Sequence, residues 1–356
     1  MEKLKESINY LAQPAIYFIG STVLFFAALY SRRVWTAKWG IGILSAMALF
    51  LGLSMFDPNF RSIVMKPDNV PIVGMIFLIG FFFWLAMKQA YENDERIAAG
   101  KDVMERSDAR ANVWPDLVYV ELICLVLVSV LLIVWSIGIH APLEQPAAPT
   151  KSPNPSKAPW YFLGLQEMLV YFDPWLAGVV FPSLIIFGLI AIPYIDKNPK
   201  GNGYYTFAER RFAITTFGFG FIILWISLII LGTFLRGPNW NFFGPYEHWD
   251  AHKVVPLNNV NLSEFIYVKW MQTGLPGHWL KREMYGILAV ILYLFGLPPL
   301  LAITVFRKFY KEMGFIRYNV MAILFLLMLA LPIKMFLRWM FNLKYIVAIP
   351  EFFFNI

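Results

Sequence analysis

Eight windows of mostly apolar residues, each long enough to cross a bilayer as a helix, constrain this chain more than any other feature. A membrane-spanning helix needs about 20 such residues, and it satisfies its backbone hydrogen bonds internally. The windows cover residues 15–31, 39–56, 70–89, 116–139, 175–194, 212–234, 284–306 and 319–341. The sequence therefore predicts an all-α, polytopic membrane protein of about eight transmembrane helices with short interfacial helices.

Positive charge is concentrated on one side of this predicted bundle. More than half of the 30 Lys and Arg residues lie in the compact loops after the first, third, fifth and seventh windows. Cytoplasmic loops carry such an excess, so these loops are expected on the inner side of a bacterial cytoplasmic (inner) membrane. The other loops and both termini are then expected on the outer, periplasmic side. The same distribution explains the net charge of +7 without a nucleic-acid partner.

A stretch rich in charges of both signs, residues 92–112, divides the chain. It is typical of a solvated connector between membrane regions. We expect a region 1–111 with three helices and this connector, a region 112–236 with three helices, and a region 237–356 with an outer aromatic loop and two further helices. Residues 1–14 place apolar side chains at helical spacing, which predicts a short interfacial helix.

A proline-rich loop between the fourth and fifth windows ends in an aromatic step, defined here as Trp160, Tyr161 and Phe162. Pro159 precedes these residues, and proline suits the first turn of a helix because its ring fixes φ. A short helix that starts here holds the aromatic side chains in a fixed orientation at the membrane edge. Such a step suits a pocket for a lipid-soluble quinol. The alternative interpretation is an inert aromatic belt at the membrane interface.

From Trp114 to about Arg236, the order of features resembles the C-terminal half of cytochrome b, which is the separate subunit IV of cytochrome bf complexes. Trp114 and Pro115 open a helix, the proline-rich loop and the aromatic step follow, and the next helix ends at Pro193 before a basic loop and a third helix. The chain departs from this family at one point. The family's loop usually reads Pro-Glu-Trp-Tyr, whereas here Ala158 and Pro159 precede Trp160.

The resemblance implies a membrane subunit of a Rieske/cytochrome b-type quinol:cytochrome c oxidoreductase that contributes to proton translocation and electron transfer. Pro159, Trp160, Tyr161 and Phe162 would line the outer quinol-oxidation pocket, with quinol as substrate. The implied partners are a di-haem cytochrome b N-terminal-like subunit, a Rieske iron–sulfur protein, c-type cytochromes and membrane lipids. One electron from the quinol would pass to the Rieske cluster and the other to the low-potential haem.

Three acidic residues are candidates for moving protons. Glu167 lies seven residues after Trp160, on the same helical face, and is expected to replace the missing loop glutamate as catalytic proton acceptor. Its alternative is a structural role, facing water or a basic group. Asp116 matches a position where the family takes up protons on the inner side, although an acid at a helix N-terminus is also favoured electrostatically. Glu121, deeper in the same window, is expected to be structural.

The chain has few residues that could hold a redox centre. Its only cysteine is Cys124, and its histidines are His140, His248, His252 and His278, none of them deep within a window. We expect no haem or metal bound by this chain, so the b and c haems and the 2Fe–2S cluster are expected in partner subunits. Two other functions remain open: a non-redox structural membrane anchor of a respiratory complex, and a secondary transporter.

Overall fold

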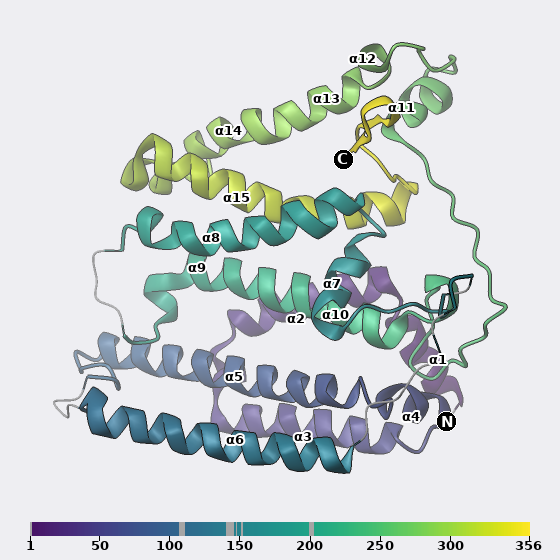
Figure 1. Ribbon diagram of the computed structural model, residues 1–356. Coiled ribbons are helices and arrows are strands. Elements are labelled where there is room, and N and C mark those ends of the chain that lie inside the picture. The colour runs from purple at the N-terminus through teal and green to yellow at the C-terminus, as the bar shows by residue number, and fades with distance from the viewer. Residues whose placement is uncertain (1, 107–110, 140–145, 147, 151, 199–202) are drawn as a thin grey trace.

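The computed structural model describes residues 2–356 except 107–110, 140–145, 147, 151 and 199–202, and it is a bundle of long helices (Figure 1). Within these residues, seven helices are long and apolar enough to cross a membrane, or eight if one bent pair forms a span. The spans are Ala37–Ser54 (α3), Val70–Ala98 (α5), Val113–Gly138, Leu176–Ile195, Phe207–Leu235, Met284–Ile303, Arg307–Phe341 (α15) and the bent pair Glu2–Leu11 (α1) with Pro14–Leu29 (α2). The expected fold class is confirmed.

Four of the spans contain wider, π-type turns between regular helical segments. Such turns break the regular hydrogen-bond ladder and locally change the direction of side chains. The segments are η2 (Val113–Leu117) with α6 (Val118–Gly138), η3 (Leu176–Val180) with α8 (Phe181–Ile195), α9 (Phe207–Gly218), η4 (Phe219–Ile226), α10 (Ser227–Ile230) and η5 (Leu231–Leu235) in one span, and α13 (Met284–Ile291), η8 (Leu292–Gly296) and α14 (Leu297–Ile303) in another.

The first span begins with a sharp bend. The axes of α1 and α2 differ by 78° across a short break, and Pro14 is the first residue of α2. Proline has no backbone N–H and disfavours a helical conformation in the preceding residue, which explains why α1 ends before it. No residue of α1 is buried. The separate helix expected within residues 1–14 is therefore present.

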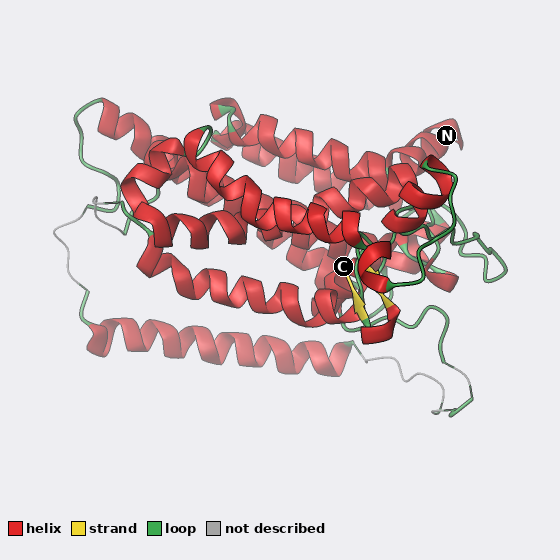
Figure 2. Ribbon diagram, turned by 90° about the horizontal axis from the view of Figure 1, so that it is seen from above, coloured by secondary structure: helices red, strands yellow, loops and turns green. Residues whose placement is uncertain are grey.

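The short elements and both termini gather at one end of the bundle, here called the α7 end (Figures 1 and 2). The short helical elements of this end are α4 (Pro58–Val64), α7 (Trp160–Met168), η6 (Pro238–Trp240), α11 (Leu262–Glu264), η7 (Phe265–Trp270), α12 (Trp279–Arg282) and η9 (Pro350–Phe352). The loops after α5 and α8 lie at the opposite end, as does the turn between α14 and α15. The grouping of loops deduced from eight crossings is thus present in the structure.

At the opposite end, the buried side chain of Asn93 in α5 joins the loop after α5 to the loop before α9. Its Nδ2 donates hydrogen bonds to Glu105 Oε2 at 2.7 Å and to the Tyr205 carbonyl at 2.9 Å, and its Oδ1 accepts from the backbone N–H of Met104. A buried amide is stable only when its donors and acceptors are satisfied, and here both kinds are used.

The span Phe207–Leu235 is the centre of packing, because half of its membrane window is buried. Its Phe219 and Leu231 join one apolar cluster with Leu29 of α2, Phe172 after α7 and Met335 of α15. By contrast, no residue of α6 is buried. The span Phe207–Leu235, against which α7 packs, is therefore the most buried of the seven single-helix spans, and the span that contains α6 is the least buried.

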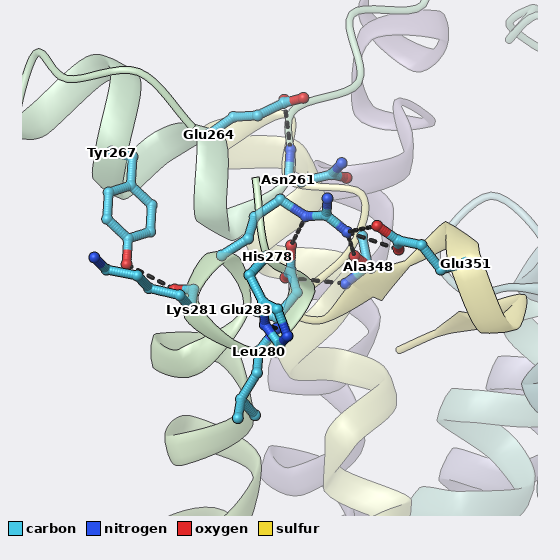
Figure 3. Close-up of polar contacts among 10 residues, drawn as sticks. Asn261, Glu264, Tyr267, His278, Leu280, Lys281, Glu283, Ala348 and Glu351 are labelled. Atoms are coloured by element: carbon cyan, nitrogen blue, oxygen red, sulfur yellow. Dashed lines mark hydrogen bonds and ion pairs between the residues drawn. The ribbon is translucent and has the colours of Figure 1, made fainter. Parts of the chain in front are cut away.

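A small hairpin near the C-terminus is fastened to the start of α13. The strands β1 (Ala348–Ile349) and β2 (Phe354–Asn355) pair antiparallel. The backbone N–H of Ala348 donates to Glu283 Oε2 at 3.1 Å, and Arg282 donates to Glu351 at 2.9 Å and to Glu283 at 3.2 Å (Figure 3). Arg282 thereby lowers the pKa of the exposed Glu351 carboxyl.

We predict that Glu283→Ala destabilises the protein by about 1–3 kcal/mol, because the substitution leaves the buried Ala348 N–H without an acceptor. Glu283 is 1% exposed. The matched control is Glu312→Ala, which removes an exposed ion pair with Lys308 and should change stability by less than about 1 kcal/mol. Thermal unfolding in detergent measures both variants. Equal melting temperatures would show that the hydrogen bond between Glu283 and Ala348 does not stabilise the protein.

Candidate functional site

The aromatic step lies at the start of α7, as the sequence predicts. Pro159 immediately precedes the helix, and its carbonyl accepts a hydrogen bond from Phe162 N at 2.8 Å. Trp160, Tyr161 and Phe162 are 39%, 48% and 51% exposed. The ring centroids of Trp160 and Tyr161 are 5.6 Å apart, and those of Tyr161 and Phe162 are 4.7 Å apart. The three rings thus form an apolar surface that residues of this chain only half cover.

A side chain of α7 holds the proline-rich loop against the helix. Gln166 Oε1 accepts a hydrogen bond from the backbone N–H of Ala158 at 2.8 Å, and its Nε2 donates to the Ser156 carbonyl at 2.8 Å. Because both amide atoms bond to loop backbone, the loop conformation just before Pro159 is fixed by the helix that follows it.

Glu167 is fully buried and forms an ion pair instead of facing a cavity. Arg236, the residue after η5, donates to both carboxylate oxygens, from Nη2 at 2.7 Å and from Nε at 3.0 Å. Trp240 Nε1 donates to the same carboxylate at 3.0 Å. Such bidentate pairing stabilises the ionised carboxylate. Glu167 can accept a proton only if it first releases Arg236, and this geometry favours the structural interpretation of its role.

The turn that brings Trp240 to Glu167 has an unusual backbone. Asn239 and Trp240 both adopt left-handed conformations, with φ of 57° each. For a bulky residue this conformation is strained and persists only where contacts hold it. Asn154 of the proline-rich loop supplies two of them: its Oδ1 accepts from Asn239 N at 2.7 Å, and its Nδ2 donates to Asn239 Oδ1 at 3.0 Å. The loop before α7 and the turn after η5 are therefore one unit.

Lys157 extends into the same region, two residues before Pro159. Its Nζ donates to the Thr233 carbonyl at 2.8 Å and lies 4.7 Å from the ring centroid of Trp249. Burial lowers the pKa of the Lys157 amine to about 7, the charges of Lys66 and Arg236 act in the same direction, and Glu167 opposes them. An amine with this pKa exchanges its proton near neutral pH. The sequence analysis did not single out this residue, although its position three residues before Trp160 was a signal.

Asp116 lies in the span Val113–Gly138, away from α7. Its Oδ2 accepts a hydrogen bond from the backbone N–H of Asn112 at 3.1 Å, and it is exposed. This contact satisfies a donor at a helix N-terminus, which is a sufficient structural reason for an acid here. The structure does not bring Asp116 and Glu167 together. Proton uptake by Asp116 therefore stays a prediction about a second, separate site.

In the described part of the chain, no three His, Cys, Asp or Glu side chains gather as a metal site requires. His248 and His252 lie in the loop after η6, and His278 uses Nδ1 to accept the backbone N–H of Leu280 at 3.3 Å. His140 falls outside the described residues.

Comparison with known families agrees with the resemblance seen in the sequence. Residues 146–244 match the family described as cytochrome b (C-terminal)/b6/petD. This family belongs to the bc1/b6f oxidoreductase complexes and typically binds no haem. The matched residues include the aromatic step, Lys157, Glu167, Arg236 and Trp240. No curated protein and no solved structure matches the chain.

We predict that Arg236→Met lowers the free energy of unfolding by about 3–5 kcal/mol, because it leaves a buried carboxylate unpaired. The double variant Glu167→Met/Arg236→Met should recover most of this loss, since it leaves no buried charge. Thermal unfolding in detergent distinguishes the variants. A double variant no more stable than Arg236→Met would show that packing around these side chains, and not the charge, dominates.

Proposed function

We propose that this chain, whose residues 146–244 form a cytochrome b C-terminal/b6/petD domain, is a membrane subunit of a bc-type complex that oxidises quinol and reduces a c-type cytochrome. The observation that carries the proposal is the half-exposed aromatic step inside that domain, held at the start of α7 by Pro159 and Gln166. In the proposal, this step forms one wall of the quinol-oxidation pocket.

In the proposal, the aromatic step supplies one rigid wall of the pocket, and the partner subunits that accept the electrons supply the others. A quinol head group is flat and apolar, so it packs well against aromatic rings in a pocket with few polar groups. Oxidation removes two electrons and two protons. In the proposal, one electron passes to the 2Fe–2S cluster of a Rieske protein and the other to a haem of a di-haem cytochrome b N-terminal-like subunit. The exposed side of the aromatic step is where those subunits complete the pocket.

A proton acceptor is needed next to the quinol, because an uncompensated charge is unfavourable in a pocket of low polarity. Glu167, the acceptor expected from the sequence, is bound to Arg236 and must leave this pair before it can act. Lys157 needs no such rearrangement, since its pKa of about 7 leaves a substantial neutral fraction at neutral pH. We therefore propose Lys157 as the first candidate and keep Glu167 as the second.

The location of the pocket follows from charge. The loops at the end opposite α7 carry most of the Lys and Arg, so the positive-inside rule puts the α7 end on the periplasmic side. Asp116 would then lie near the inner side, where a second quinone site takes up protons. Together these assignments make the subunit part of a proton-translocating path.

We predict that Trp160→Leu lowers the rate of quinol oxidation by the purified complex by at least about tenfold, since one aromatic wall of the pocket is lost. The matched control is Phe353→Leu, because Phe353 is also aromatic, is 89% exposed and lies in the C-terminal hairpin. Subunit composition and haem absorbance should be unchanged in both variants. Equal rates for Trp160→Leu and the control would favour the alternative of a non-redox structural anchor.

We predict that the rate of quinol oxidation rises as pH increases through about 7, because only the neutral Lys157 amine can accept a proton. Lys157→Met should remove this rise, whereas Lys253→Met, which removes a cation paired with Glu247 at the same end, should retain it. Glu167→Gln tests the second candidate in the same assay. A lower rate with Glu167→Gln, together with an unchanged pH profile with Lys157→Met, would make Glu167 and not Lys157 the first candidate for the proton acceptor.

A further inference from the structure

The helix α6 lies apart from the rest of the bundle. Every residue from Val113 to Ile139 is exposed except Val118, which is half-buried. Among the seven single-helix spans, Val113–Gly138 has the highest mean hydropathy, and none of the residues in its membrane window is buried. It is the outlying helix at the lower edge of Figure 2. Its surface is therefore left for lipid or for another membrane protein to cover.

One ionisable residue interrupts this apolar surface. Glu121 is exposed, and no hydrogen bond or ion pair joins it to another described residue. With about 1.5 Å of rise per residue and a hydrocarbon layer about 30 Å thick, Glu121 lies roughly 5–8 Å inside the hydrocarbon. Ionisable groups at such depth are costly and almost always pair with a partner or face a protein interior. Lipid tails offer Glu121 neither.

We propose that α6 docks against a membrane-spanning helix of a different subunit, which presents a Lys, Arg or His side chain to Glu121. Charge complementarity selects this occupant. A second copy that packed its α6 against this α6 about a two-fold axis along the membrane normal would bring the two Glu121 side chains together at the same depth, which is repulsive. The buried cations Lys334 and Arg338 belong to the C-terminal part of α15, which ends at the α7 end, whereas Glu121 belongs to the N-terminal part of its span, which begins at the opposite end.

This interface rests on the part of the proposed function that makes the chain a subunit of a membrane complex. It does not depend on quinol oxidation, so a failure of the aromatic step to act in oxidation would leave it standing. It also specifies the role of Glu121, which the sequence analysis expected only to be structural. The contact face is defined by Glu121 and the residues three, four and seven positions later, Cys124, Leu125 and Val128, which share one side of the helix.

Cys124 provides a direct test, because it is the only cysteine of the chain, is exposed and lies one turn from Glu121. In native membranes, Cys124 is labelled with a membrane-permeant maleimide that carries a photoactivated benzophenone, and cross-linked products are identified by mass spectrometry. We expect a product with a transmembrane helix of another subunit. Products with lipid alone, or with a second copy of this chain, would overturn the proposal.

A matched control uses the opposite side of the helix. Val130→Cys in a Cys124→Ser background moves the thiol about half a turn around the helix from Glu121. We expect the yield of the same product to fall at least about threefold. An equal yield from both positions would show that the face of Glu121 is not selected, and would count against the proposal.

The second measurement uses charge. Glu121→Lys should reduce the amount of the cross-linked subunit that co-purifies with the tagged chain by about tenfold, and Glu121→Gln should reduce it less because an amide still forms a hydrogen bond. The level of the chain in the membrane is measured in parallel. An unchanged amount of the co-purified subunit with Glu121→Lys would overturn the proposal. If that variant does not insert into the membrane, the identity of the Cys124 cross-linked product tests the proposal instead.

Discussion

The buried ion pair between Glu167 and Arg236 is the contact on which the candidate site depends. It joins α7 to the end of the best-buried span, and Trp240 attaches the following turn to the same carboxylate. A buried pair of this kind is favourable only when its remaining hydrogen bonds are satisfied, as they are here. The position of the aromatic step is a consequence, since α7 cannot rotate without breaking the pair.

Two titratable side chains of the candidate site, Glu167 and Lys157, have different surroundings. An acid close to the aromatic step was expected to accept a proton, but its carboxylate is used to fix the helix. The loop before the helix supplies a different titratable group, Lys157, held by the Thr233 carbonyl and by Trp249. Burial next to other cations shifts this amine toward neutral pH. In our proposal, Glu167 positions the helix and Lys157 exchanges the proton.

The chain alone leaves apolar surface uncovered in two places, and both are consistent with an assembled complex. The aromatic step is half-exposed at the α7 end, and every residue of α6 except Val118 is exposed. These surfaces lie on different elements, so different partners or different parts of one partner can cover them. The central span, by contrast, is packed by α2, α7 and α15, and half of its membrane window is buried within this chain.

The sequence by itself determined the all-helical membrane fold with seven or eight candidate spans, the grouping of loops and the family of residues 146–244. These follow from local properties: the length of apolar windows, the distribution of charge and the order of Pro159, Trp160 and Tyr161. Only the tertiary structure decided that Glu167 meets Arg236, that Lys157 is half-buried against Thr233 and Trp249, and that Glu121 has no partner in the described chain. Each of these depends on contacts between residues far apart in sequence, or on their absence, and helical periodicity does not specify either.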